Sequence, residues 1–238
     1  MQSSLTVEKV NTLLFDVDGT LMDSIEMVIA GLGDAFEKYG SYRPTRSEIA
    51  AQIGKPLTDQ MFLFGCSPEN DEELEEMISY TLARYEAHAH LESEFNDAVE
   101  ALILAKEKGL KIALITSRNH VELDALKRHF RAWDSVDLAI CASDVTSPKP
   151  APESIFIALE KLGEKPENAV MIGDSTFDLR CGNSAGVRTA ACLYGAGKAN
   201  HLLAEAPSYV LDTPADLLEW VHNLIEQREN ATEENHTH

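Results

Sequence analysis

Four short polar clusters in this chain hold residue types that could do chemistry together. They are DVDGT at 16–20, the pair Thr116-Ser117, SPKP at 147–150, and GDSTFD at 173–178. Moving a phosphoryl group requires a carboxylate that attacks phosphorus in line, a divalent metal that neutralises charge, and donors that hold the equatorial oxygens. The clusters offer carboxylates, hydroxyls and a lysine. The chemistry that they predict is therefore phosphoryl transfer.

The spacing of these residues suggests a role for each. Asp16 is the expected nucleophile and would carry an aspartyl-phosphate. Asp18, two residues further on, is expected to protonate the leaving oxygen and then to activate the hydrolytic water. Thr116 and Lys149 are expected to hold the phosphoryl oxygens, and Ser117 is a further candidate for that task.

The same acids form a candidate metal site. Mg²⁺ prefers oxygen ligands and keeps several waters, so Asp16, the backbone carbonyl of Asp18 and Asp174 would suffice as protein ligands. Asp178, four residues after Asp174, either reaches the metal itself or holds a ligand water. We therefore expect Mg²⁺ to be the cofactor.

The polar clusters follow continuous apolar runs, which predict strands buried on both faces, as in a parallel sheet. Strong runs occupy residues 10–17, 111–117, 136–142 and 169–174, and weaker ones residues 189–193 and 209–211. Segments of helical period lie at 98–108, 121–130 and 152–162. The alternation predicts an α/β fold with a doubly wound, Rossmann-like parallel sheet. Ligands of such sheets bind beyond the carboxyl ends of the strands, where the polar clusters lie.

Residues 22–91 break this alternation and predict an all-helical insertion, which we call the cap. Ser24 is expected to cap a helix that Gly40 closes, and a second helix is expected to open at Ser67-Pro68. The apolar stripe of the second helix, interpreted as cap core, is Leu74, Met77, Ile78, Leu82 and Tyr85. The predicted domains are an α/β catalytic core of residues 1–21 and 92–227, the cap of residues 22–91, and a disordered tail of residues 228–238.

Several residues have two open interpretations. Lys55 in IGKPL either reaches from the cap to the substrate or is a surface lysine. Arg118 and Asn119 either contact the substrate or are exposed at the start of a helix. The cysteines lack a metal-binding spacing and are expected to be buried, reduced thiols: Cys66, Cys141, Cys181 and Cys192.

The ordered motifs resemble those of a known family. DVDGT, the threonine of LITS, the lysine of SPKPAPE and GDSTFD look like the four motifs of the haloacid dehalogenase superfamily, over about residues 10–194. The helical insertion directly after DVDGT resembles the small helical cap of that superfamily. DGTLMDS, IGKPL and GDSTFDL followed by GNSAG look most like the branch of phosphoglycolate phosphatase, pyrophosphatase and β-phosphoglucomutase. The resemblance implies the same roles for Asp16, Asp18, Thr116, Lys149, Asp174 and Asp178.

The resemblance implies a hydrolase, a Mg²⁺-dependent phosphatase acting on phosphoric monoesters. The dehalogenases and the phosphonate-cleaving relatives lack the second acid of the first motif, so Asp18 favours phosphate-ester chemistry. A small phosphorylated metabolite is the expected substrate, with phosphoglycolate the best single choice. A β-phosphoglucomutase-like phosphosugar mutase and a pyrophosphatase stay open. A non-catalytic phosphate-binding regulator is a third alternative, against which the intact acids and Lys149 argue.

Composition and charge exclude other classes of function. The chain has 238 residues, with 20 Lys and Arg against 40 Asp and Glu, which gives a net charge of −20. Such a chain is repelled by phosphate backbones and anionic bilayers, so neither nucleic acid nor membrane is an expected partner. No apolar run approaches the roughly 18 residues of a membrane span, and no basic, apolar leader opens the sequence. We expect a cytoplasmic monomer or small homo-oligomer.

Overall fold

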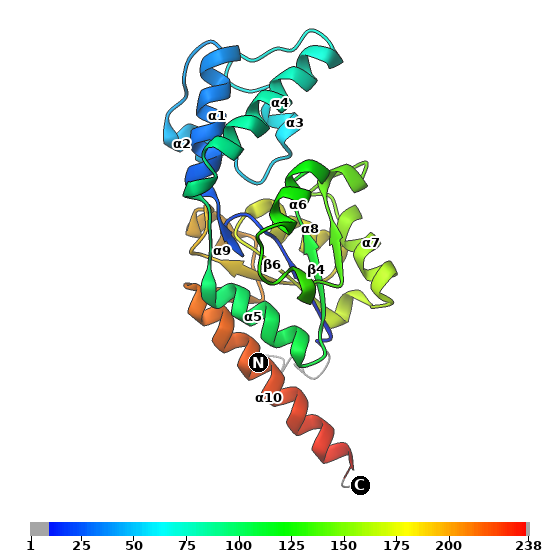
Figure 1. The fold of residues 1–238 in the computed structure, drawn as a ribbon. Coiled ribbons are helices and arrows are strands. Elements are labelled where there is room, and N and C mark those ends of the chain that lie inside the picture. The colour runs from blue at the N-terminus through cyan, green and yellow to red at the C-terminus, as the bar shows by residue number, and fades with distance from the viewer. Residues whose placement is uncertain (1–9, 237–238) are drawn as a thin grey trace.

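The chain folds around a six-stranded sheet with strand order β5-β4-β1-β6-β7-β8 (Figure 1). The structure is a computed structural model that describes residues 10–236. The strands are β1 (Thr12–Phe15), β4 (Lys111–Ile115), β5 (Leu138–Ile140), β6 (Ala169–Gly173), β7 (Arg188–Cys192) and β8 (Tyr209–Leu211). Every neighbouring pair in this sheet is parallel. The predicted doubly wound α/β fold is confirmed.

The two faces of the sheet carry separate apolar cores, because successive side chains of a strand point to opposite faces. In β1, Leu13 and Phe15 belong to one core and Leu14 to the other. The helices that complete the first core are α5 (Asn96–Glu107), α6 (His120–Lys127) and α10 (Pro214–His236). Those that complete the second are α7 (Glu153–Leu162) and α8 (Thr176–Ala185). Burial on both faces explains why the strands read as continuous apolar runs.

The remaining elements outside the sheet are short. Helix α9 spans Ala199–Ala204, and single 3-10 turns lie at Ala89–Leu91, Trp133–Ser135, Ala142–Asp144 and Pro166–Asn168. The four cysteines are buried and free, as the sequence predicts. No helix among residues 10–236 is long and apolar enough to cross a membrane.

The cap residues form a group of helices with a third apolar core. The helices are α1 (Ile25–Tyr39), α2 (Arg46–Ala50), α3 (Leu57–Gln60) and α4 (Asp71–Ala87). Helix α4 begins after Asn70, whose side chain accepts a hydrogen bond from the Glu73 backbone, rather than at Ser67-Pro68. Ser24 precedes α1 as expected, but its side chain makes no cap bond and donates to Asp18 instead.

A small antiparallel pair joins the cap to the core. Strand β2 (Met22–Asp23) leads into the cap, and β3 (Ser93–Glu94) leads out of it. Two-residue strands have no readable period, so the sequence did not reveal them. The pair lies at the predicted borders 21/22 and 91/92, although the division into two domains itself stays a prediction.

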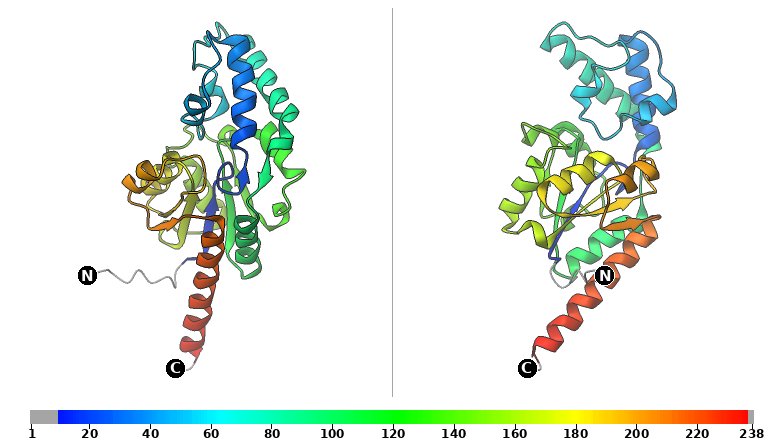
Figure 2. Two further views of the ribbon diagram at one scale, coloured as in Figure 1. Left: turned by 90° about the vertical axis from the view of Figure 1, so that its left-hand side faces the viewer. Right: turned by 180° about the vertical axis from the view of Figure 1, so that it is seen from behind.

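The cap and α10 lie at opposite ends of the molecule (Figure 2). The cap stands beyond the carboxyl ends of the central strands, while α10 packs along α5 and continues away from the sheet (Figure 1). The expected disorder from residue 228 onward is not what the structure shows, because α10 continues as a helix to His236. Residues 228–236 include the helix formers Arg, Glu and Ala next to an established helix, and Lys108 Nζ lies 2.9 Å from Glu229 Oε1. Residues 237 and 238 lie outside the described part.

A charged network joins the two long helices of the cap. Asp34 of α1 accepts hydrogen bonds from Arg84 Nε of α4 at 2.7 Å and from Arg43 Nη1 at 3.1 Å, and His88 Nε2 lies 3.0 Å away. Burial works to raise the pKa of Asp34, but these hydrogen bonds outweigh it and lower the pKa from 3.8 to about 2. The charged carboxylate therefore stabilises the folded state above pH 3.8, and this contribution disappears as the pH falls toward 2.

We predict that Asp34→Asn lowers the free energy of unfolding at neutral pH by roughly 1 kcal/mol, since the network is partly solvated. Thermal unfolding followed from neutral to acidic pH should show the variant and the wild type converging near pH 2. Asp212→Asn is the control, because Asp212 is exposed and makes no hydrogen bond or ion pair with the described residues. A deficit in Asp34→Asn that does not change with pH would contradict this account.

Candidate active site

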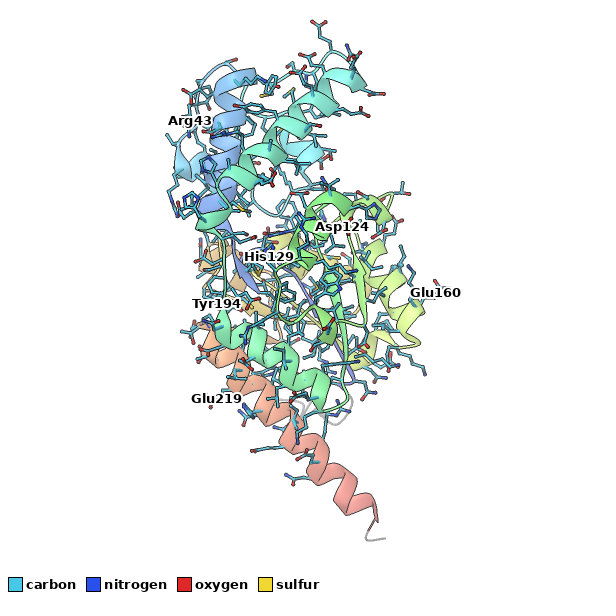
Figure 3. All side chains as sticks on the ribbon, in the orientation of Figure 1. Arg43, Asp124, His129, Glu160, Tyr194 and Glu219 are labelled. Atoms are coloured by element: carbon cyan, nitrogen blue, oxygen red, sulfur yellow. The ribbon has the colours of Figure 1, made fainter. Side chains whose placement is uncertain are left out.

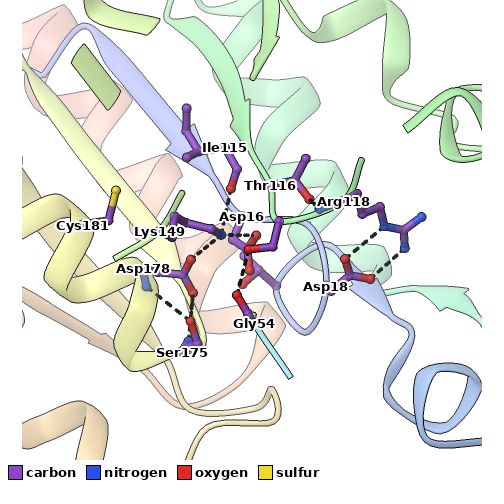
Figure 4. A network of polar contacts seen from close by, with 12 residues as sticks. Asp16, Asp18, Gly54, Ile115, Thr116, Arg118, Lys149, Ser175, Asp178 and Cys181 are labelled. Carbon is purple, nitrogen blue, oxygen red and sulfur yellow. Dashed lines mark hydrogen bonds and ion pairs between the residues drawn. The ribbon is translucent and has the colours of Figure 1, made fainter. Parts of the chain in front are cut away.

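The carboxyl ends of the strands bring most of the predicted site residues into one crevice (Figure 4). Asp16 follows β1, Thr116 follows β4, and Asp174 follows β6. All are almost fully buried, together with Lys149 and with Asp178 in the first turn of α8. The sequence prediction that these residues converge is therefore consistent with their positions.

Lys149 is the centre of the crevice. Its Nζ donates to Asp16 Oδ1 at 2.8 Å, to Asp178 Oδ1 at 2.6 Å and to the carbonyl oxygen of Ile115 at 3.0 Å. Burial works to lower the pKa of Lys149, but the charges of Asp16 and Asp178 outweigh it and hold the pKa above the ordinary value. The ammonium group is thus charged, immobilised and in contact with the predicted nucleophile.

Asp16, Asp174 and Asp178 form a cluster of carboxylates whose oxygens lie within 4.8 Å of one another. Burial, and then the charge of Asp178, raises the pKa of Asp16 to about 7. Burial also raises the pKa of Asp174 well above its ordinary value, with Asp16 and Asp178 adding to the shift. Lys149 alone does not balance three carboxylates. An all-oxygen donor set with excess negative charge suits a hard divalent cation such as Mg²⁺.

The close fit of backbone around Asp174 fixes its carboxylate. The Ala196 backbone donates to Asp174 Oδ2 at 2.7 Å, and Thr20 Oγ1 lies 3.4 Å from Oδ1. Gly19 has a φ of +82°, and a Cβ added there would lie 2.2 Å from Asp174 Oδ2. Glycine is therefore required at position 19 both by the turn and by the approach of the carboxylate.

Asp178 is oriented by the start of α8. Its Oδ2 accepts hydrogen bonds from the backbone and the hydroxyl of Ser175, at 3.0 and 2.5 Å, while its Oδ1 accepts from Lys149. This capping box is a local consequence of the sequence Ser175-Thr-Phe-Asp178. The helix start thus holds Asp178 beside the other two acids.

Asp18 faces away from this cluster and toward Arg118 (Figure 4). Arg118 donates from Nε to Oδ2 at 3.0 Å and from Nη2 to Oδ1 at 2.7 Å, and Ser24 also donates to Oδ1. Burial works to raise the pKa of Asp18, but Arg118 outweighs it and lowers the pKa below the ordinary value. In this arrangement Asp18 is a charged partner of a buried arginine.

Arg118 is a site residue for which the sequence allowed either contact with the substrate or exposure to solvent. It is 8% exposed and also donates to Glu92 Oε1 at 2.6 Å, while His129 Nε2 lies 3.1 Å from Glu92 Oε2. Asn119, its neighbour, caps α6 through its side chain instead of pointing at a ligand. Nothing in the sequence pattern marks Glu92, because its partner Arg118 lies 26 residues further along the chain.

The other predicted ligands make contacts with backbone or cap. Thr116 Oγ1 accepts from the Arg118 backbone at 3.1 Å, and Ser117 Oγ donates to the Gly54 carbonyl of the cap at 2.8 Å. Lys55 donates to Gln52 Oε1 at 2.7 Å and lines the space between cap and core. Lys55 thus has access to a bound molecule without belonging to the acidic cluster.

A cavity of about 570 Å³ lies between the cap and the carboxyl edge of the sheet. Asp16 and Asp18 lie in its wall, with residues of α1, α4 and α6 around them. Asp124 and His129 mark its core side in Figure 3. Glu122 also lines it, and burial raises the pKa of this carboxyl to about 7. The cavity connects the predicted nucleophile to the cap.

Comparison with known proteins identifies related sequences. The sequence pattern of the Haloacid dehalogenase-like hydrolase family matches residues 13–192. Pyrophosphatase PpaX of Bacillus velezensis is 33% identical over 217 residues, which are 90% of this chain and 97% of the relative. Pyrophosphatase PpaX of Halalkalibacterium halodurans is 32% identical over 214 residues, again 90% and 97% of the two chains.

Solved structures share the fold. A protein described as a haloacid dehalogenase-like hydrolase from Bacteroides fragilis superposes with a TM-score of 0.79 at 26% identity, covering 88% of this chain and 100% of that one. A predicted phosphoglycolate phosphatase from Haemophilus somnus superposes with the same TM-score at 19% identity, covering 89% and 97%. The second similarity, at such low identity, supports the fold alone.

Removing the central ammonium group tests the electrostatic account of the crevice. We predict that Lys149→Met destabilises the protein by about 3 kcal/mol at neutral pH, because buried carboxylates lose their cation. Chemical denaturation should show this loss, and millimolar Mg²⁺ should restore part of it. The control is Lys161→Met, which changes an exposed lysine of α7. Unchanged stability of Lys149→Met without added metal would be incompatible with a charge-balancing Lys149.

Proposed function

The chain belongs to the haloacid dehalogenase-like hydrolases and is a phosphatase of that family, and from this premise we propose that it hydrolyses a small phosphorylated metabolite through an aspartyl-phosphate on Asp16, with Mg²⁺ as cofactor. The observation that carries the proposal is the contact between Asp16 and Lys149 beside Asp174 and Asp178. A carboxylate with a fixed ammonium partner and further acids nearby suits attack on phosphorus.

The metal would be held by the carboxylates of Asp16 and Asp174 and by the backbone carbonyl of Asp18, with Asp178 binding it directly or through a water. Bound Mg²⁺ supplies positive charge between the nucleophile and the phosphoryl oxygens. The excess negative charge of the cluster supports this assignment, as does its set of three carboxylates without histidine or cysteine.

In the first step, an Asp16 oxygen forms a bond to phosphorus as the bond from phosphorus to the leaving oxygen breaks. Lys149, Thr116 and Ser117 hold the phosphoryl oxygens during this exchange. Asp18 gives a proton to the leaving oxygen. Asp18 is a charged carboxylate paired with Arg118 in this structure, so the pair must first separate and Asp18 must take up a proton from solvent before it gives one to the leaving oxygen.

In the second step, water attacks phosphorus and the bond from phosphorus to Asp16 breaks, which releases inorganic phosphate. Asp18, now without its proton, takes one from the attacking water. The nucleophile returns to its carboxylate form and remains in contact with Lys149. The two steps together consume one water for each ester cleaved.

The substrate is the finer part of the proposal. We place phosphoglycolate-like small anions first, because Lys55 lines the cavity and offers a positive charge to a small anionic group. Pyrophosphate is the second candidate, favoured by the two PpaX relatives. A phosphosugar mutase has less support. The cap loop after Gly54 contributes two polar residues to the cavity, Lys55 and Gln60, which is modest provision for binding the hydroxyl groups of a sugar. We further place the protein in the cytoplasm as a monomer or small homo-oligomer.

Replacing the nucleophile gives the most direct test. Asp16→Asn should lower Mg²⁺-dependent phosphate release below about 0.1% of wild type, because an amide cannot form the acyl phosphate. Its stability should hold or rise, since carboxylate repulsion falls. Phosphate release and thermal unfolding measured on the same sample separate these effects. Measurable steady-state turnover in Asp16→Asn would exclude Asp16 as the nucleophile.

Metal replacement is a separate test. We predict no turnover in excess chelator, full recovery with Mg²⁺, and inhibition by Ca²⁺. The larger Ca²⁺ takes more oxygen ligands and would bind both oxygens of Asp16, which misaligns the attack. Initial rates across a Mg²⁺ titration, with and without Ca²⁺, measure this. Full activity in chelator would show that the acidic cluster works without a cation.

A further inference from the structure

The hydroxyl of Tyr85 is an unused polar group in the wall of the cavity. Tyr85 lies near the end of α4, is 9% exposed and lines the cavity that contains Asp16 and Asp18. No described residue makes a hydrogen bond with its hydroxyl. The hydroxyl is not among the buried polar atoms that lack a partner, so it is accessible, and in the cavity wall it can form a hydrogen bond with a bound molecule.

The ring of Tyr85 is held in place by the cap. A Cβ at Gly31 of α1 would lie 2.4 Å from Tyr85 Cδ1, so the absence of a side chain at position 31 creates the space for the ring. The ring also belongs to the apolar core of the cap. Tyr85 lines the same cavity as Asp18 and Glu122. Burial raises the pKa of its phenol, and the charges of Glu122 and Asp18 raise it further.

The cavity wall around Tyr85 has apolar surface contributed by cap and core. The cap contributes Val28, Leu57 and Leu82, and the core contributes Val121, whose side chain is 63% exposed. A volume of about 570 Å³ is in the range of sites that enclose organic molecules, roughly 300–1,000 Å³. Carbon atoms gain from contact with such a wall, whereas a charged phosphate loses hydration there.

The charges of the wall also disfavour a second phosphate group. Besides Asp16 and Asp18, its acidic residues are Glu86, Glu92, Glu122 and Asp124, and its basic residues are Lys55, Arg118, Arg128 and His129. Arg118 is already paired with Asp18 and Glu92, and His129 contacts Glu92. Lys55 and Arg128 are the basic residues left to bind a ligand. Their positive charge suffices for one small anionic group but not for a phosphate dianion near these acids.

We propose that Tyr85 is a substrate-binding residue that selects phosphate monoesters of organic alcohols over pyrophosphate. The carbon-bearing leaving group occupies the apolar part of the cavity, and one of its polar atoms forms a hydrogen bond with the phenol. This inference rests on the proposed phosphatase function and specifies its substrate class.

The test compares Tyr85→Phe with wild type on four substrates in Mg²⁺: pyrophosphate, phosphoglycolate, glycerol 3-phosphate and ribose 5-phosphate. Tyr85→Phe removes only a hydroxyl that has no partner among the described residues, so the fold should be unaffected. The matched control is Tyr80→Phe on the same helix, whose ring packs against Tyr39 in the cap.

We expect at least one organic monoester to exceed pyrophosphate about tenfold in kcat/KM. For that ester, Tyr85→Phe should raise KM about tenfold with kcat little changed, equivalent to one hydrogen bond of about 1.4 kcal/mol. The values for pyrophosphate, and every value for Tyr80→Phe, should stay within about twofold of wild type.

Two results would overturn the inference and leave the phosphatase function standing. One is a kcat/KM for pyrophosphate above those of all three organic esters. The other is an equal loss on pyrophosphate and on the esters in Tyr85→Phe, which would mean that the ring acts through the structure of the cap. Failure to release phosphate from any of the four substrates would instead remove the proposed function, and this inference with it.

Discussion

The placement of one ammonium group among three buried carboxylates is the constraint on which the site depends. Lys149, Asp16 and Asp178 come from three separate segments, and each would be costly to bury without the others. The carboxyl edge of the parallel sheet brings these segments together, and helix starts and backbone amides complete their hydrogen bonds. The apolar sheet therefore serves as a rigid support for charges that it could not otherwise enclose.

The ion pair of Asp18 with Arg118 is separate from the cluster around Lys149, so the crevice has two distinct charged regions. Asp18 is only two residues from Asp16, yet it belongs with Arg118 and Glu92 on the cap side. Two neighbouring acids of the same motif thus experience opposite environments, with a raised pKa at Asp16 and a lowered one at Asp18. A nucleophile requires its charged form and a proton donor its protonated form, so catalysis requires positive charge to be added beside Asp16 and Arg118 to move away from Asp18.

Whether a feature of the fold or the site could be predicted from the sequence depended on how far apart along the chain the interacting residues lie. The strands and the acids after them were predictable, because a buried run and its terminal residues are adjacent in the chain. The pairing of Arg118 with Glu92 was not, since it depends on how the exit from the cap meets the loop after β4. Tyr85 was predicted as cap core, which is half of its role. Periodicity finds the buried face of a ring but not the direction of its hydroxyl.

The β2–β3 pair has a consequence for how such a chain can change over generations. Because Met22 pairs with Glu94, and Asp23 with Ser93, the two ends of the inserted segment are already side by side. The entropy of closing a loop grows only slowly with its length, so the segment between these strands can lengthen, shorten or be exchanged at little thermodynamic cost. The sheet register and its acidic edge would persist through such exchanges. New specificities can thus arise by recombination of one contiguous stretch of coding sequence, with the chemistry inherited unchanged.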